Sequence, residues 1–147
     1  MHIRRAVPAD AEAVLALINR LLEELGGQAI PSDIAGQTFG RLVTGQDAGL
    51  VLVAQEEDHI IGVCTVSFQQ AIRSLGPYAI IQEMYVAPEF RSRGAGTALV
   101  EEAVNRARSL GFRMVEVGTP AGGDRQEAFY QRLGFAPVGL RLRRPTL

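Results

Sequence analysis

Two arginines and two glycines stand close together at positions 91 to 96, in the order Arg-Ser-Arg-Gly-Ala-Gly. The stretch lies between an apolar run that ends at Val86 and a helical pattern from about Gly94 to Leu110. A loop that opens a helix leaves the backbone N–H groups of the first turn unpaired, and the guanidinium groups of Arg91 and Arg93 add positive charge beside them. This combination suits a diphosphate. The spacing therefore predicts that the loop holds a phosphorylated cofactor.

Two familiar phosphate-binding motifs can be compared with this loop. A P-loop requires lysine after its second glycine, but Gly96 is followed by Thr97 and Ala98, which excludes an ATPase of that type. A dinucleotide fingerprint requires a third glycine or alanine where Leu99 stands, although Glu116 lies where a ribose-binding acid belongs. Only about 30 residues follow Glu116, too few for the second half of a doubly wound sheet. A nicotinamide-binding oxidoreductase therefore stays an alternative that the chain length opposes.

The composition limits the classes of protein to consider. The chain has 147 residues, 47% of them hydrophobic, and we expect a single domain at 1–147. Its formal net charge of −1 provides no strong field that would draw it to nucleic acid or to an anionic membrane. No window approaches the roughly 20 apolar residues of a membrane span. The first six residues also lack the apolar core of a signal peptide. From the net charge and these apolar patterns together, we expect neither membrane nor nucleic-acid partners.

The single cysteine, Cys64, lies in the apolar run from Ile60 to Val66, which favours a buried structural thiol over a nucleophile. One cysteine cannot form an internal disulfide, and this fits the reducing cytoplasm as the location. Together with His2 and His59 it offers no ligand cluster of the usual spacing, so we expect no metal.

The spacing of apolar residues predicts helices and strands along the whole chain. The helix that ends near Gly45 has the weakest pattern, because its apolar residues recur with little periodicity, and this would suit a mobile arm. The predicted order is a strand at 2–6, helices from 8 to 26 and from 31 to 45, a hairpin of 49–55 and 60–69, a strand at 78–86, a helix at 94–110, a strand at 112–117, a short helix at 124–133 and a strand at 135–143.

The last predicted strand has an alternating pattern. Leu140 and Leu142 alternate with Arg141 and Arg143, as on a strand with one apolar and one solvated face. We interpret it as the strand that completes the sheet, with a solvated edge. The alternative role for the arginines is recognition of an acidic substrate or a dimer contact. The strand, helix and strand between 78 and 117 imply a right-handed parallel crossover. The predicted fold class is α/β, with helices around a mixed sheet.

Several motifs, in the right order, are similar to the Gcn5-related N-acetyltransferase (GNAT) superfamily. Arg91-x-x-Gly94-x-Gly96 resembles the Arg/Gln-x-x-Gly-x-Gly/Ala loop that binds the pyrophosphate of acetyl-CoA, and Met-Tyr-Val-Ala-Pro at 84–88 is similar to the strand end that precedes it. The segment 128–135, with Phe-Tyr-x-x-x-Gly-Phe, resembles the family's C-terminal motif. The opening Ile-Arg-x-Ala with Asp10 resembles the family's first strand and turn. Together these motifs cover nearly the whole chain.

The resemblance implies a mostly antiparallel sheet that is splayed between the parallel strands 78–86 and 112–117, with acetyl-CoA in the cleft. The pantetheine arm would pair with the exposed backbone at the end of strand 78–86, as an additional strand would. The residues that the resemblance assigns to acetyl-CoA are Met84, Tyr85 and Val86 for pantetheine, and Arg91, Arg93, Gly94, Ala95, Gly96 and Thr97 for the pyrophosphate.

Transfer of an acetyl group to an amine requires a base for the alkylammonium, whose pKa is about 10.4, and benefits from an acid for a thiolate with a pKa of about 8.5. The resemblance implies direct attack without an acyl-enzyme, with Tyr130 as the acid. Glu83 is the candidate base on the strand beside the cleft. Because Gln82 stands where several relatives carry an acid, a water relayed to backbone carbonyls is the alternative base.

We therefore expect a cytoplasmic acetyl-CoA-dependent N-acetyltransferase that acts on a primary amine, in a small molecule or in a protein. A CoA-binding sensor without transferase activity is the second alternative, favoured if Gln82 marks a lost base. Homodimers are common among similar proteins, but no sequence feature demands one. No recognisable motif identifies the acceptor.

Overall fold

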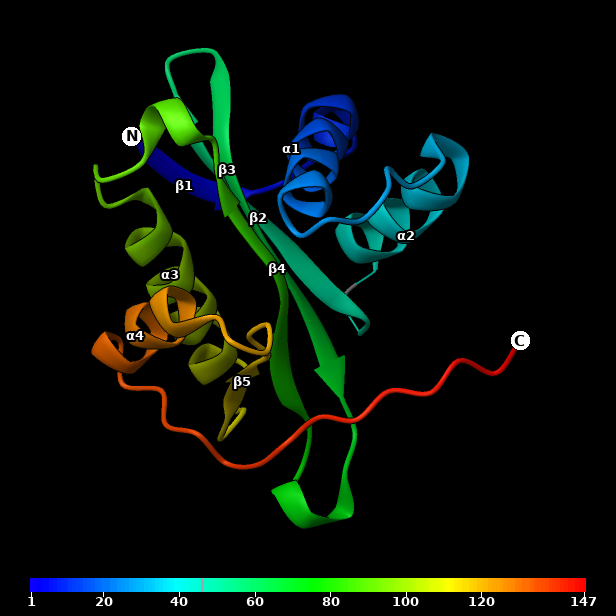
Figure 1. Ribbon diagram of the computed structural model, residues 1–147, viewed down its shortest axis with the longest axis vertical. Coiled ribbons are helices and arrows are strands. Elements are labelled where there is room, and N and C mark those ends of the chain that lie inside the picture. The colour runs from blue at the N-terminus through cyan, green and yellow to red at the C-terminus, as the bar shows by residue number, and fades with distance from the viewer. Residues whose placement is uncertain (46) are drawn as a thin grey trace.

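A five-stranded sheet forms the centre of the computed structural model, which describes residues 1–45 and 47–147 (Figure 1). The strands lie in chain order across the sheet, the first four antiparallel and the fifth parallel to the fourth. They are β1 (His2–Arg5), β2 (Gly49–Glu56), β3 (His59–Gln69), β4 (Tyr78–Val86) and β5 (Val115–Val117). The predicted fold class, a mixed α/β sandwich with a parallel pair at one side, is thus confirmed.

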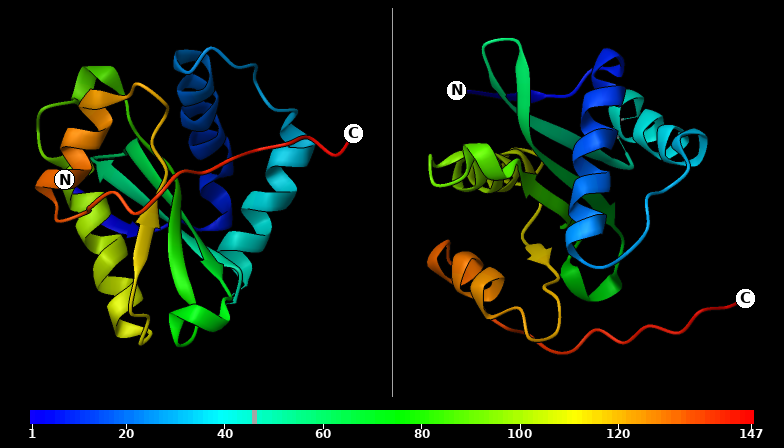
Figure 2. Two further views of the ribbon diagram at one scale, coloured as in Figure 1. Left: turned by 60° about the horizontal axis from the view of Figure 1, so that its bottom comes forward. Right: turned by 45° about the horizontal axis from the view of Figure 1, so that its top comes forward.

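Helices cover both faces of this sheet (Figure 2). Helices α1 (Ala11–Glu24) and α2 (Ser32–Thr44) lie on one face, and α3 (Ala95–Ser109) and α4 (Asp124–Arg132) on the other. Short 3₁₀ turns occur at Pro8–Asp10, Ile72–Ser74 and Pro88–Phe90.

Strand β2 shows why this arrangement follows from the sequence. Its side chains alternate between faces, so Leu50 and Leu52 pack with α3 while Val51 and Val53 pack with α1 and α2. All four are buried. A strand covered on both faces carries a nearly continuous apolar run, and the segment 49–55 has such a run.

An ion pair joins β1 to the start of α1. The guanidinium of Arg4 donates to both carboxylate oxygens of Asp10, at 2.8 and 3.0 Å, and the backbone N–H of Val7 donates to the same carboxylate at 2.8 Å. The hydrogen bond from Arg4 is the largest cause that lowers the pKa of Asp10. The residues that resemble the family's opening motif therefore fix the turn from the first strand into the first helix.

Two predictions for the middle of the chain need correction. Helix α2 is not a loosely attached arm, because Phe39 is buried against the sheet among the side chains of β2 and α1. Strand β5 is shorter than the predicted 112–117: only Val115–Val117 pairs with β4, opposite Ala79 to Ile81. Phe112 instead packs edge-on against Phe68, with ring centroids 4.9 Å apart.

The strand predicted at 135–143 is wrong. After α4 the chain forms no further helix or strand in the described residues, and its end projects from the body (Figures 1 and 2). A strand requires a hydrogen-bonded neighbour for its backbone groups, and in the described part of the chain no strand pairs with this segment. Leu140 and Leu142 are consequently 93% and 89% exposed.

Candidate active site

A β-bulge in the pairing of β3 with β4 lies at the level where β4 and β5 stop pairing. Thr65 on β3 is opposite Glu83 and Val66 is opposite Ile81, so Gln82 is the extra residue on β4. Pairing between β4 and β5 ends at the same level, with Ile81 opposite Val117. Because a bulge bends its strand, β4 diverges from β5 beyond Ile81. The splayed parallel pair that the family resemblance implies is therefore present, and its local cause is the bulge at Gln82.

A pocket of about 110 Å³ occupies this gap. Leu21 of α1 and Leu25, the residue that follows this helix, line it from one face of the sheet, and Tyr130 of α4 lines it from the other. Glu83 and Met84 border it along β4, and residues 117–120 border it after β5. Two substrates that approach from opposite faces could therefore meet in this pocket.

Tyr130 is buried to 7% exposure, and its ring packs edge-on against Phe129 and Phe135, at centroid distances of 5.0 and 5.5 Å. Its hydroxyl makes no hydrogen bond to another described residue, and no fully buried side-chain polar atom of the described part lacks a partner. The hydroxyl therefore reaches the pocket surface. Burial raises the pKa of Tyr130, so the hydroxyl stays protonated at neutral pH and available as a donor.

Glu83 is half-buried on the bulged part of β4. Its backbone N–H donates to the Thr65 hydroxyl at 3.1 Å. Burial raises the pKa of its carboxyl group, and a hydrogen bond with Thr65 partly opposes this. No arginine or lysine in the described residues forms an ion pair with Glu83, whereas Gln82 is exposed. A carboxylate with a raised pKa at a cleft is suited to accept a proton.

Cys64, opposite Met84, is completely buried, as predicted. Burial raises the pKa of its thiol to about 12. A thiol that stays protonated and cannot reach a substrate is unsuited to act as a nucleophile.

The loop before α3 has the conformation that a phosphate-binding turn needs. Gly94 has a φ of 84°, in the left-handed region that favours glycine, and a side chain there would point into open space. Ala95, Gly96 and Thr97 form the first turn of α3, whose N–H groups have no partner within the helix. The Cβ that Gly96 lacks would lie 3.5 Å from Phe129 and 3.6 Å from Met84. Gly96 thus lies against the side chain of Met84, which also lines the pocket.

Both loop arginines have protein partners. The Nε of Arg91 donates to the Val86 carbonyl at 2.9 Å, its Nη2 lies 3.1 Å from the Glu24 carboxylate, and Arg93 lies 3.5 Å from Glu56. Both charges therefore also have a structural use in the protein itself. Exposed ion pairs contribute only about 0–1 kcal/mol, so a phosphate could displace either carboxylate at little cost.

Glu24 is a functional candidate that sequence reasoning missed. It ends α1, accepts a hydrogen bond from the Tyr85 hydroxyl at 2.7 Å and pairs with Arg91. These two contacts, that of Tyr85 first, lower the pKa of Glu24. The Tyr85 side chain is consequently engaged with α1, so only its backbone remains for a cofactor. No motif marks Glu24, because its partners are 61 and 67 residues away.

Glu116 does not lie where a ribose-binding acid should. It is opposite Ile80, and β4 continues six residues beyond Ile80 before it ends at Val86. At about 3.3 Å per residue this places Glu116 roughly 20 Å from the end of the strand. The geometry therefore does not support the nicotinamide interpretation.

Within 1–45 and 47–147, no three His, Cys, Asp or Glu side chains are grouped so that they could hold a metal ion. None of the helices in these ranges combines the length and apolar character that a membrane crossing requires.

Residues 16–135 match the acetyltransferase (GNAT) family, and the chain belongs to this family. It is an N-acetyltransferase. The relatives include YhfO of Bacillus subtilis, an uncharacterized N-acetyltransferase that is 26% identical over 136 residues, or 92% of this chain and 89% of YhfO.

The uncharacterized N-acetyltransferase MJ1207 of Methanocaldococcus jannaschii is 44% identical over 57 residues, which is 39% of this chain but only 25% of MJ1207. Among solved structures, the aminoglycoside N-acetyltransferase AAC(6')-Iy in complex with CoA has the same fold. It superposes with a TM-score of 0.85 and 19% identity, over 99% of this chain and 95% of that chain.

Proposed function

We propose that this chain transfers the acetyl group of acetyl-CoA directly to a primary amine. The observation that carries the proposal is the pocket at the bulge of β4, which Tyr130 lines from one face of the sheet and α1 from the other. Glu83 lines the same pocket, and Met84, which also lines it, lies against Gly96 in the first turn of α3. This arrangement supports an acid, a base and an anion-binding turn that serve one reaction.

The residues present fit acetyl-CoA. The amides of Arg93 to Thr97 and the two guanidinium groups supply the donors and positive charge that a diphosphate needs. Beyond Ile81, no strand of the described residues pairs with β4 on the β5 side, so Met84, Tyr85 and Val86 can pair with the amides of pantetheine. The Val86 carbonyl already accepts a hydrogen bond from Arg91. To pair with pantetheine, this carbonyl must use its second lone pair or exchange partners.

The proposed reaction has one covalent step. The amine nitrogen attacks the thioester carbonyl carbon, a C–N bond forms, and the C–S bond breaks. Glu83 accepts the proton that the ammonium loses, directly or through water, and Tyr130 donates its proton to the departing sulfur. Tyr130 then regains a proton from solvent. Cys64 takes no part.

The acceptor is a primary amine that enters from the α1 face, in a small molecule or in a protein. AAC(6')-Iy is an aminoglycoside N-acetyltransferase of the same fold, which favours a small-molecule acceptor. Membership of an acetyltransferase family weighs against a sensor without activity and against an oxidoreductase.

Thiol release tests this proposal. The protein should release CoA from acetyl-CoA in the presence of at least one member of a panel of aminoglycosides, polyamines, amino acids and lysine peptides. Mass spectrometry should show that amine heavier by one acetyl group. Acetyl-CoA binding without turnover across the panel would favour the sensor, and binding of NADH instead would favour the oxidoreductase.

Replacing Glu83 by glutamine should remove the acidic limb of the pH–rate profile. Since burial raises the pKa of Glu83, wild-type kcat should rise with pH through a pKa above that of an ordinary glutamate. The variant should lack this rise, and at neutral pH its kcat should be lower than that of the wild type by about 100-fold or more. Glu101→Gln is the matched control, since it makes the same change at an exposed position of α3 that does not line the pocket. An unchanged profile in the Glu83 variant would instead assign the base to the water relay.

A further inference from the structure

The C-terminal tail, residues 139–147, places one cation beside the active-site pocket. The Nη1 of Arg141 lies 3.8 Å from the position that a Cβ on Gly118 would occupy. Gly118 lines the pocket at the bulge of β4, as Glu83 does. Because Gly118 has no side chain, nothing at this position holds the guanidinium group away from the backbone. The tail therefore brings a guanidinium group to the rim of the pocket.

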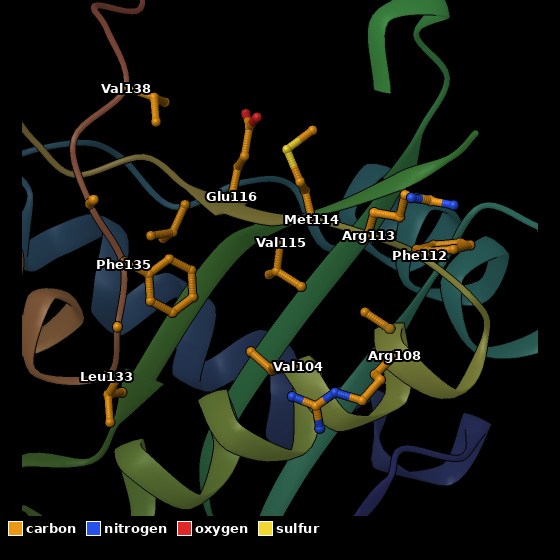
Figure 3. Close-up of a pocket in the computed structure, with 14 residues that line it drawn as sticks. Val104, Arg108, Phe112, Arg113, Met114, Val115, Glu116, Leu133, Phe135 and Val138 are labelled. Carbon is orange, nitrogen blue, oxygen red and sulfur yellow. The ribbon is translucent and has the colours of Figure 1, made fainter. Parts of the chain in front are cut away.

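Gly118 faces the side of the sheet from which the amine should enter. Figure 3 shows β5 beside a cavity that it shares with α3: the Val115 side chain points toward Val104 of α3, whereas the Glu116 side chain points the opposite way. Side chains alternate along a strand, and Gly118 follows Glu116 by two residues, so a side chain there would also point away from α3. Helix α1 lies on that face of the sheet. Arg141 is thus on the acceptor side and not on the side of α3.

Arg141 has no carboxylate partner in the described residues. None of the ion pairs formed there includes an arginine of the tail. Glu116 lies on the same face as Gly118 but is not paired with Arg141 either. The Arg141 side chain is exposed, and a guanidinium group is charged at every pH that the protein meets. It is therefore available to bind an anion that enters the pocket.

The pocket consequently has opposite charges at two of its borders. Glu83 on β4 is the proposed base for the ammonium group, and Arg141 lies at the segment that follows β5. Neighbouring strands are about 4.8 Å apart, so β4 and β5 are still close where their pairing ends at Ile81 and Val117. The volume of about 110 Å³ is also well below the roughly 300–1,000 Å³ of sites for drug-sized ligands. One short molecule with an amine and a carboxylate can reach both charges.

We propose that Arg141 binds the carboxylate of a short amino acid, and that this contact selects the acceptor. The proposal rests on the acetyl transfer proposed above and names the substrate class of the same pocket. A guanidinium group can hold a carboxylate through two parallel N–H···O bonds, which fixes the orientation of the molecule. The amine nitrogen then lies on the side of Glu83, where it loses its proton before it attacks the thioester. Arg141 determines specificity and takes no part in the covalent step.

Acetylation of matched acids and amides tests this assignment. The acids are glycine, β-alanine and 4-aminobutyrate, and each is compared with its carboxamide. Arg141→Gln should lower kcat/KM for the acids by about tenfold or more, through KM, and leave kcat/KM for the amides unchanged. Because each comparison sets two proteins against one acceptor, the different amine pKa values of acid and amide cancel. Calorimetry should give the same Kd for acetyl-CoA in both proteins.

A charge reversal separates recognition from a structural role. Arg141→Glu should lower kcat/KM for β-alanine and raise it for 1,3-diaminopropane, in which a second ammonium group replaces the carboxylate. The matched control is Arg113→Glu, which makes the same charge change at an exposed residue that lines the cavity of Figure 3 and not the pocket. This control should keep wild-type kcat/KM for both acceptors.

Three outcomes would overturn the assignment. The first is a kcat/KM for the acids that Arg141→Gln leaves unchanged, or that falls equally for acids and amides. The second is acetylation of other amines but of none of the acids, which would leave the proposed acetyl transfer intact. The third is acetylation of no amine at all, which would defeat the proposed acetyl transfer together with this assignment.

Discussion

Tyr130→Phe should lower kcat by roughly 100-fold to 10,000-fold and leave the Kd for acetyl-CoA nearly unchanged. The substitution removes one oxygen that lies at the cleft and keeps the ring that packs against Phe129 and Phe135. Without the hydroxyl the thiolate departs without a proton donor. Steady-state kinetics and calorimetry on the same preparation measure the two quantities.

The matched control for this experiment is Tyr78→Phe. Tyr78 is another buried tyrosine, at the opposite end of β4, where it interacts with Arg73 rather than with the cleft. Its variant should keep wild-type kcat. Equal kcat for wild type and Tyr130→Phe would remove Tyr130 from the mechanism, and a parallel loss of acetyl-CoA binding would make it a binding residue.

Reversal of both loop charges, Arg91→Glu with Arg93→Glu, should raise the Kd for acetyl-CoA by about 100-fold or more. A charge-assisted hydrogen bond contributes about 1.5–3 kcal/mol, and the new carboxylates repel the phosphates. Stability should change little, because the ion pairs of Arg91 with Glu24 and of Arg93 with Glu56 are exposed. Calorimetric titration gives the Kd, and thermal unfolding gives the stability.

Arg41→Glu with Arg73→Glu is the control, since both side chains are exposed, lie away from the loop and produce the same change in net charge. If this control weakens binding as much as the loop variant does, the effect belongs to the overall charge. Wild-type affinity in the loop variant would remove both arginines from the phosphate site.

Local patterns predicted those parts of the site whose residues are close in sequence. The turn at Gly94 has a left-handed glycine at its centre, and the burial of Cys64 depends on its apolar neighbours, so both could be predicted from short segments. The order of elements from β1 to α4 followed from hydrophobic periodicity for the same reason.

Contacts between distant residues were not predictable in this way. Nothing in the sequence signals that Arg91 meets Glu24 or that Gln82 forms a bulge, because each depends on how separate elements align. The alternation of Leu140 and Leu142 is a genuine strand pattern, but periodicity does not specify which edge a strand pairs with. The tail therefore appears as a strand in the sequence and as an unpaired segment in the structure.

Calorimetric titration of the wild-type protein with acetyl-CoA, followed by S-acetylpantetheine, measures what the turn before α3 contributes. Both ligands carry the same thioester and the same arm, but only acetyl-CoA carries the diphosphate. We predict saturable binding of acetyl-CoA at one site per chain, with an affinity at least about 100-fold higher than that of S-acetylpantetheine. No heat with acetyl-CoA, or equal affinity for the two ligands, would contradict a diphosphate site at Arg91 to Thr97.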